Sequence, residues 1–269
     1  MRLALSQFSL PGLSTREFLD VAGRAGAEGC ELGVIGGPRA SEDPRTIIAA
    51  ARGSGMPIES VNALRDWGLP DDPDCRPVFE MLLEVAVEAG APLIVCVAPI
   101  RFENMPPREE VIAAASERLA MLAELAGPAG VRLALEQVGR SSTRVGAQSG
   151  IRSLADALAV VESAGPSVGL VLDSYNLATG GVPFEDVARL PRERIALAHV
   201  VDGVASGSPR AFPGDGELPL GSFVAALAEA GFDGALSIEI FPAESPPEPL
   251  EFARRGLDAL RSLLPASVV

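Results

Sequence analysis

The sequence predicts an α/β fold, a single (β/α)8 TIM barrel made from the whole chain, residues 1–269. Three observations lead to this prediction. Eight short apolar runs are bounded by turn residues, helical patterns lie between successive runs, and the length suits a barrel that has not split into further domains. Strands that alternate with helices form parallel β–α units, and eight such units close into a barrel.

Each predicted strand is a short run dominated by aliphatic residues, as in GLVLD over residues 169–173. Turn residues on either side separate these runs from the helical patterns. The predicted strands are Leu3–Phe8, Gly29–Gly33, Pro57–Asn62, Leu93–Ala98, Arg132–Glu136, Val168–Asp173, Ile195–Val200 and Ala235–Ile240.

Several of the intervening helices carry recognisable start or stop signals. Ser14 and Glu17 have the spacing of a capping box ahead of an apolar run. Pro107 precedes a helix over residues 108–126, in which apolar residues recur at helical spacing. The segment 222–230 ends at a glycine, which suits the C-terminus of a helix.

The basic residues exclude several kinds of chemistry. All 22 Lys+Arg positions are arginine, so a Schiff-base lysine, a pyridoxal-phosphate linkage and a P-loop lysine are excluded. His199 is the only histidine, which excludes metal clusters built from several imidazoles. Carboxylates must therefore carry most of any acid–base chemistry.

The net charge, the cysteines and the apolar runs indicate which kinds of binding partner and which cellular location to expect. A net charge of −14 repels polyphosphate, so no nucleic-acid partner is expected. The 3 cysteines include no C-x-x-C pair and indicate neither a disulfide framework nor a thiolate cluster. The longest apolar run, residues 91–100, falls short of the ~20 residues of a membrane helix, and residues 1–10 show no signal-peptide pattern. We therefore expect a cytoplasmic protein that acts on a small molecule and has no membrane partner.

Strong metal-ligand types stand at the ends of four predicted strands. LALEQ contains Glu136, LVLDS contains Asp173, LAHVV contains His199 and LSIEIF contains Glu239. In a barrel of this kind, the carboxyl ends of the strands and the loops that follow them build the active site. Because these strands are neighbours in the predicted barrel, we expect the four side chains to converge.

Three carboxylates at one place repel one another unless a positive charge lies among them. Carboxylate oxygens and one imidazole suit one divalent cation such as Mn²⁺, Mg²⁺, Co²⁺ or Zn²⁺. The alternatives are a hydrogen-bonded core histidine for His199 and arginine ion pairs for Glu136 and Glu239. Glu31, at the end of the second strand, is left open between a substrate contact and a rim residue.

The C-terminal half carries the motifs of a known family. They are ALEQVG (134–139), GLVLDSYN (169–176), AHVVD (198–202), RAFPGDGELPL (210–220) and SIEIF (237–241). With these motifs the chain resembles the xylose isomerase-like barrel superfamily of sugar isomerases and epimerases, and within it the inosose (2-keto-myo-inositol) isomerases. The N-terminal half agrees more loosely, through SVNAL (60–64) and VCVAPI (95–100).

The resemblance implies roles for the matching positions. It makes the strand-end residues the ligands of one divalent metal, namely Glu136, Asp173, His199 and Glu239. It also implies that Arg210, before the P-G-x-G turn, contacts the substrate, and that Asn62 in SVNAL lies in the substrate site. Asn176 departs from the family's D-x-x-H pattern, because an asparagine stands where the pattern has a histidine. Its amide donates and accepts hydrogen bonds but neither takes up nor releases a proton near neutral pH. We expect Asn176 to bind substrate without acting as an acid or a base.

The loops after the strands are expected to determine specificity. Trp67 is predicted to form an apolar wall of the substrate site. Five arginines follow strand ends and suggest a locally positive mouth for a polyol, a carboxylate or a phosphate ester, although surface solvation is an alternative for some of them. They are Arg65, Arg101, Arg140, Arg144 and Arg210.

Together these features predict a divalent-metal-dependent isomerase or epimerase of a ketose or keto-cyclitol. Glu136 and Glu239 would serve as base and acid, and the proton would move through a metal-stabilised cis-enediolate. A lyase of the dehydroshikimate- or inosose-dehydratase type would use the same residues to expel a β-hydroxyl. A non-catalytic sugar-binding barrel is a third alternative. Alanine-rich helix faces such as residues 111–126 would suit a homodimer, or packing on the barrel.

Overall fold

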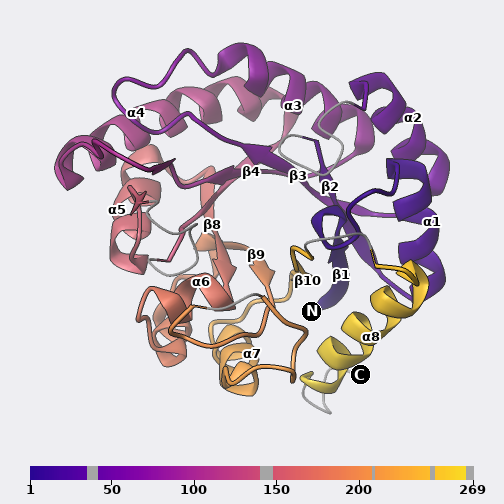
Figure 1. Ribbon diagram of the computed structural model, residues 1–269. Helices are drawn as coiled ribbons and strands as arrows, with labels where there is room; N and C mark the ends of the chain where they lie inside the picture. The colour runs from indigo at the N-terminus through magenta and orange to yellow at the C-terminus, as the bar shows by residue number, and fades with distance from the viewer. Residues whose placement is uncertain (35–41, 140–147, 208–209, 243–245, 265–269) are drawn as a thin grey trace.

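Eight parallel strands close into a barrel, and helices cover its outside (Figure 1). The computed structural model describes residues 1–34, 42–139, 148–207, 210–242 and 246–264. Around the barrel the strands follow the order β1-β10-β9-β8-β6-β4-β3-β2, which confirms the predicted (β/α)8 fold. They are β1 (Arg2–Ser6), β2 (Gly29–Gly33), β3 (Ile58–Leu64), β4 (Leu93–Val97), β6 (Arg132–Glu136), β8 (Val168–Asp173), β9 (Ile195–His199) and β10 (Ala235–Ile238).

The strand bounds agree with the prediction for β2, β6 and β8 and differ by a few residues elsewhere. The last strand ends at Ile238, so Glu239 is the first residue beyond it. A further pair of short strands, β5 (Ile100–Arg101) and β7 (Gln148–Ser149), forms an antiparallel sheet outside the barrel. Two-residue strands leave no recognisable periodicity in a sequence, which is why this pair was not predicted.

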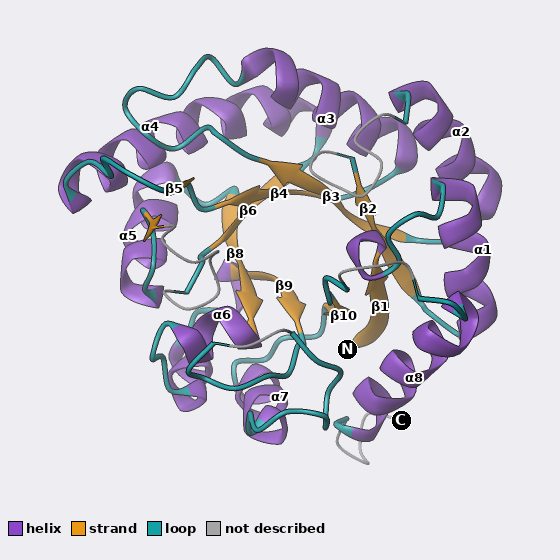
Figure 2. Cartoon of the chain, viewed as in Figure 1, coloured by secondary structure: helices purple, strands orange, loops and turns teal. Residues whose placement is uncertain are grey.

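The helices lie around the barrel as one outer layer (Figure 2). They are α1 (Thr15–Ala25), α2 (Pro44–Ser54), α3 (Arg76–Ala89), α4 (Arg108–Ala126), α5 (Leu154–Ala164), α6 (Ser174–Thr179), α7 (Leu220–Glu229) and α8 (Pro249–Ser262). Short 3-10 helices occupy Gln7–Ser9, Gly127–Ala129, Phe184–Arg189 and Arg192–Arg194. The final helix α8 packs beside α1, and β10 pairs with β1, so the first and last β–α units meet at the closing seam of the barrel.

Apolar side chains from strands and helices form one buried core. Phe18 of α1, Phe79 of α3 and Phe223 of α7 are fully buried. Within the described residues, no helix combines the length and the apolar character needed to cross a membrane. The assembly of residues 1–269 into one domain stays a prediction.

The predicted capping box at the start of α1 is confirmed. The Ser14 hydroxyl oxygen accepts the backbone N–H of Glu17, and the Glu17 carboxylate accepts the backbone N–H of Ser14 at 2.8 Å. These two bonds satisfy N–H groups that have no partner within the helix.

Replacing Ser14 with alanine should lower the free energy of unfolding by about 0.5–2 kcal/mol, because the first turn of α1 loses its cap. Denaturant unfolding of the purified variant measures the change. Ser14→Asp keeps an acceptor at this position and should restore most of the loss; equal destabilisation by both variants would contradict the capping role.

Candidate metal centre

The structure brings the four strand-end residues together at the mouth of the barrel. One ligand atom from each of Glu136, Asp173, His199 and Glu239 lies within 4.8 Å of the others, and all four residues are buried. From Nδ1 of His199 the nearest carboxylate oxygens are at 3.2 Å on Glu239, 3.7 Å on Asp173 and 3.8 Å on Glu136. The predicted convergence of these side chains is thus found.

This arrangement fits a divalent cation. The Nδ1 atom of His199 is buried and has no hydrogen-bond partner within the described part of the chain, although it faces three carboxylates. Protein ligand atoms lie about 2.0–2.2 Å from a bound ion, so atoms within 4.8 Å of one another are close enough to share one ion once the side chains adjust. One imidazole nitrogen and carboxylate oxygens are a donor set that suits several first-row divalent metals and Mg²⁺.

The crowded carboxylates change the protonation of the imidazole. Burial by itself lowers the pKa of His199, but the charges of Glu239 and Glu31 outweigh it and raise this pKa well above its ordinary value of 6.5. Burial raises the pKa of the Glu136 carboxyl above its ordinary value. Both groups therefore hold a proton to a higher pH than they would in water, and a metal ion has to displace it.

Arg210 lies directly against the ligand cluster, whereas its contact with the substrate stays a prediction. Its Nη1 is 2.6 Å from Oδ2 of Asp173, and its guanidinium carbon lies over the rings of Tyr175 and Phe241, 5.2 and 5.0 Å from their centroids. Burial would raise the pKa of Asp173, but the positive charges of Arg210 and His199 hold it below its usual range.

A buried carboxylate folds the segment that carries this arginine back over the mouth. Asp202 accepts the backbone N–H groups of Gly214 and Leu218 at 2.8 and 3.0 Å, and it pairs through its backbone with Ala211. A Cβ atom at Gly216 would collide with the Asp202 carboxylate, so the P-G-x-G turn requires glycine there. The sequence analysis quoted Asp202 within a family motif but assigned it no role.

Asn176 orients one of the ligand carboxylates. Strand β8 ends at Asp173 and leads directly into α6, where the Asp173 side chain caps the helix by accepting the N–H of Asn176 at 2.7 Å. The Nδ2 of Asn176 donates to Oε1 of Glu136 at 2.9 Å. Gly139 is needed beside it, because a Cβ there would collide with the carbonyl oxygen of Asn176 and with Thr179.

Glu31 is not a rim residue, and a contact with the substrate stays untested. It is fully buried within β2, where its carboxylate lies 3.1 Å from Nε2 of His199. Asn62, a predicted substrate residue, donates to the same carboxylate at 3.0 Å and also lines the cavity described below. Sequence analysis missed this role because the partners come from strands far apart in the chain.

A cavity of about 160 Å³ opens beside the ligand cluster. Its polar lining includes Glu136, Asn176 and Glu239, and its aromatic wall is formed by Phe8 and Phe241, whose ring centroids are 5.7 Å apart. Ligand pockets for drug-sized molecules usually measure roughly 300–1,000 Å³, so this cavity suits one small molecule.

Trp67 does not form the apolar wall predicted for it. The side chain is fully buried, its Nε1 donates to the carbonyl oxygen of Val97 at 2.8 Å, and it is absent from the described lining of the cavity. The segment after β3 turns inward here, so that the indole packs in the core. Phe8 and Phe241 take the place that the sequence analysis gave to Trp67.

The five candidate arginines of the mouth separate into different environments. Arg65 lines the cavity, and its Nε is buried without a hydrogen-bond partner among the described residues. Arg101 forms ion pairs with the aspartates of the loop after β3, at 2.6 and 3.3 Å. Arg140 and Arg144 lie outside the described residues. Arg65 and Arg210 are therefore the arginines that the described structure brings to the cavity.

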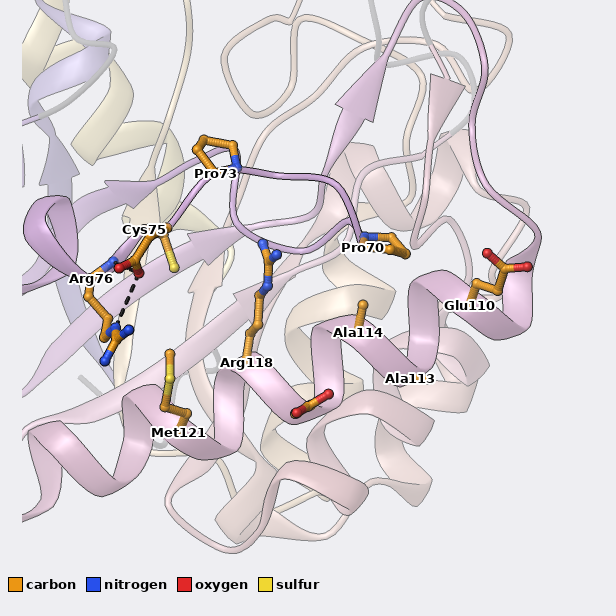
Figure 3. A pocket seen from close by; sticks show the side chains of 11 residues that line it. Pro70, Pro73, Cys75, Arg76, Glu110, Ala113, Ala114, Arg118 and Met121 are labelled. Atoms are coloured by element: carbon orange, nitrogen blue, oxygen red, sulfur yellow. Dashed lines mark hydrogen bonds and ion pairs between the residues drawn. The ribbon is translucent and has the colours of Figure 1, made fainter.

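A larger groove of about 890 Å³ lies on the outside of the barrel, between residues 70–76 and α4 (Figure 3). Arg118 of α4 links the two walls of this groove, because its guanidinium donates to the carbonyl oxygens of Trp67 and Asp72 at 2.7 and 3.0 Å. The metal-ligand cluster found in the described residues lies at the barrel mouth, so the chemistry belongs there and not in this groove.

The fold and the ligand set agree with one family of barrels. The family model described as xylose isomerase-like TIM barrel matches residues 19–263. The chain belongs to this family. The resemblance stated from the motifs is thereby confirmed over most of the chain.

Individual relatives and a solved structure show how far the similarity extends. An inosose isomerase of Bacillus velezensis is 29% identical over 195 residues, which cover 69% of this chain and 67% of that protein. A 3-dehydroshikimate dehydratase of Pseudomonas putida is 24% identical over 276 residues, which cover 98% of this chain and 41% of that protein. A crystal structure of the IolI protein with a bound zinc atom superposes with a TM-score of 0.82 at 22% identity, covering 98% of this chain and 96% of that one.

The purified protein should bind about one divalent ion per chain, and His199→Ala should lose it, because the nitrogen ligand is removed and three carboxylates remain. Elemental analysis after dialysis measures the metal content. Glu59→Gln is the matched control, since Glu59 is also buried in the barrel but pairs with Arg2 away from the cluster. Undiminished metal in His199→Ala would contradict the ligand assignment.

Metal affinity should fall as the pH is lowered, because a larger fraction of His199 and Glu136 then carries a proton that competes with the metal. The sign follows from the raised pKa of both groups: the proton competes with the metal below the pKa and leaves above it. Titration of zinc against a chelator at several pH values, corrected for the chelator's own protonation, measures this effect. A pH-independent affinity would mean that neither group is displaced by the metal.

Proposed function

We propose that this protein is a divalent-metal-dependent isomerase or epimerase of a keto-sugar or keto-cyclitol of the inosose type. The observation that carries the proposal is the position of two glutamates on opposite sides of one ligand cluster, next to a small cavity. Glu136 follows β6 and Glu239 follows β10, and the two strands between them carry Asp173 and His199. A substrate carbon in the cavity would have a carboxylate on either side.

In this proposal, the glutamates move a proton next to the carbonyl of the substrate. One carboxylate removes the proton from the carbon beside the carbonyl, and the other returns a proton to the neighbouring carbon or to the opposite face. Neighbouring side chains orient each group: Asn176 donates to Glu136 at 2.9 Å, and Ser6 donates to Glu239 at 3.4 Å. A bound divalent metal would supply electrostatic stabilisation of the negative charge that develops on the substrate's oxygens.

The remaining lining would hold a small polyhydroxylated ring. Arg210, Asn176 and Asn62 border the cavity and offer hydrogen-bond donors to the hydroxyl groups of the substrate. The Nε of Arg65, which has no hydrogen-bond partner among the described residues, gives a further donor. The rings of Phe8 and Phe241 would cover the apolar C–H face of the ring.

The inosose isomerase of Bacillus velezensis makes an inosose the first substrate to test. A dehydratase is the second candidate, because the Pseudomonas putida relative covers nearly the whole chain, although the match spans less than half of that protein. Both reactions start with removal of a proton beside a carbonyl, and they differ in whether water leaves. Asn176 serves as neither the acid nor the base in either reaction, because its amide does not change its charge state near neutral pH.

Glu136→Gln and Glu239→Gln should each lower the turnover of 2-keto-myo-inositol by roughly 10²–10⁴-fold, because general acid–base catalysis of this size depends on the titrating carboxylate. Incubation in deuterated water, followed by mass and NMR analysis of the sugar, measures exchange beside the carbonyl. The fold should persist in both variants by circular dichroism. The exposed Glu84→Gln serves as a control with full activity.

The products separate the candidate functions. Deuterium without loss of water supports the isomerase or epimerase, whereas loss of water supports the dehydratase. Retained exchange in both glutamine variants would contradict their roles. If the metal-loaded protein exchanged no proton of inososes, ketoses or dehydroshikimate, the non-catalytic barrel would be the better description.

A further inference from the structure

The imidazole of His199 contacts carboxylates through both of its nitrogens. Its Nδ1 faces the ligand cluster, with Glu239 nearest at 3.2 Å. Its Nε2 lies 3.1 Å from Oε1 and 3.2 Å from Oε2 of Glu31, so it approaches the two oxygens almost equally. Glu31 thus stands on the far side of the ring from the carboxylates that could share a metal ion.

Glu31 is itself held firmly in place. The Ser60 hydroxyl is 2.7 Å from Oε2 of Glu31, and the Nδ2 of Asn62 donates to the same oxygen at 3.0 Å. Among the described residues no arginine forms an ion pair with Glu31, and its side chain has no exposed surface. The ring of His199 is therefore the titratable group that this buried carboxylate meets within the described part of the chain.

We propose that Glu31 is a positioning residue that fixes the tautomer and the orientation of His199 for metal binding. An ionised carboxylate only accepts hydrogen bonds, so the nitrogen that faces it must carry the proton. With its proton on Nε2, a neutral imidazole presents the lone pair of Nδ1 to the cluster. Carboxylates that receive the second N–H of a metal-bound histidine orient the ring and strengthen its basicity. This inference rests on the proposed role of His199 as a ligand.

The geometry distinguishes this role from simple packing. A carboxylate held only for stability could face either ring nitrogen, whereas here the orphaned nitrogen is the one that faces Glu136, Asp173 and Glu239. Strand β2 contributes Glu31 from across the barrel mouth, and β3 contributes both groups that brace it. The imidazole ring of His199 therefore has carboxylates at both nitrogens, contributed from different sides of the barrel.

The first test measures zinc affinity by competition with a chelator. Glu31→Gln should bind zinc about 10–100-fold more weakly than the unmodified protein, because the amide no longer enforces the Nε2 proton. Glu59→Gln is the matched control: its side chain pairs with Arg2 and belongs to the opposite face of β3 from Ser60. We expect this control to lose stability but to keep its zinc affinity.

The second test reads the tautomer directly. His199 is the only histidine, so a protein labelled with ¹⁵N-histidine has a single imidazole and needs no assignment. In the zinc-loaded protein, NMR should show the ring proton on Nε2 and none on Nδ1. If Glu31→Gln does not fold, Ser60→Ala keeps both groups and removes one support of Glu31, so it should weaken zinc binding to a smaller extent.

The outcomes separate this inference from the proposed function. A proton on Nδ1 in the zinc-loaded protein, or unchanged zinc affinity in Glu31→Gln, would overturn the positioning role alone. Weakened zinc binding without exchange of any substrate proton would support the positioning role and overturn the isomerase chemistry. A protein that binds no zinc would overturn both.

Discussion

The rest of this structure depends on one constraint: several negatively charged carboxylates lie close together in a small buried volume. Four carboxylates surround one imidazole at the barrel mouth, and all are buried. They belong to Glu31, Glu136, Asp173 and Glu239. Carboxylates removed from water are stable only beside positive charge or hydrogen-bond donors. The chain provides these groups as His199, Arg210 and the amides of Asn62 and Asn176. A divalent ion would complete this balance, and the orphaned Nδ1 of His199 lies where its ligand atom is needed.

The barrel makes this crowding possible because its strands hold one another from both sides. Four consecutive strands, β6, β8, β9 and β10, bring the cluster together. Strand β2 reaches the imidazole from the other side through Glu31, which β3 supports through Ser60. The segment after β9 then returns over the mouth, held by the Asp202 carboxylate, and places Arg210 on Asp173. The strands and loops of the barrel therefore position both the carboxylates and the positively charged or hydrogen-bonding groups that stabilise them. What remains open beside the cluster is a cavity of about 160 Å³ with an aromatic edge.

Much of the candidate site could be predicted because it depends on the ends of strands. Each strand ends where its apolar run ends, so Glu136, Asp173, His199 and their neighbours could be placed without knowing any contact between them. The wall of the cavity could not be predicted in this way. Trp67 follows a strand end as the site residues do, yet it is buried in the core, and Phe8 and Phe241 line the cavity instead. Whether a loop side chain turns inward or outward depends on packing against distant segments, which leaves no local periodicity in the sequence.

The sequence by itself determined the number and chain order of the barrel strands, the absence of lysine, and the types of ligand that meet at the mouth. These follow from local patterns and from a composition that permits few other chemistries. Only the tertiary structure decided that Glu31 faces Nε2 of His199, that Asn176 orients Glu136, and that Arg210 pairs with Oδ2 of Asp173. The physical reason is that hydrogen bonds and ion pairs depend on distances of about 3 Å between segments far apart in the chain, and closure of the barrel alone sets those distances.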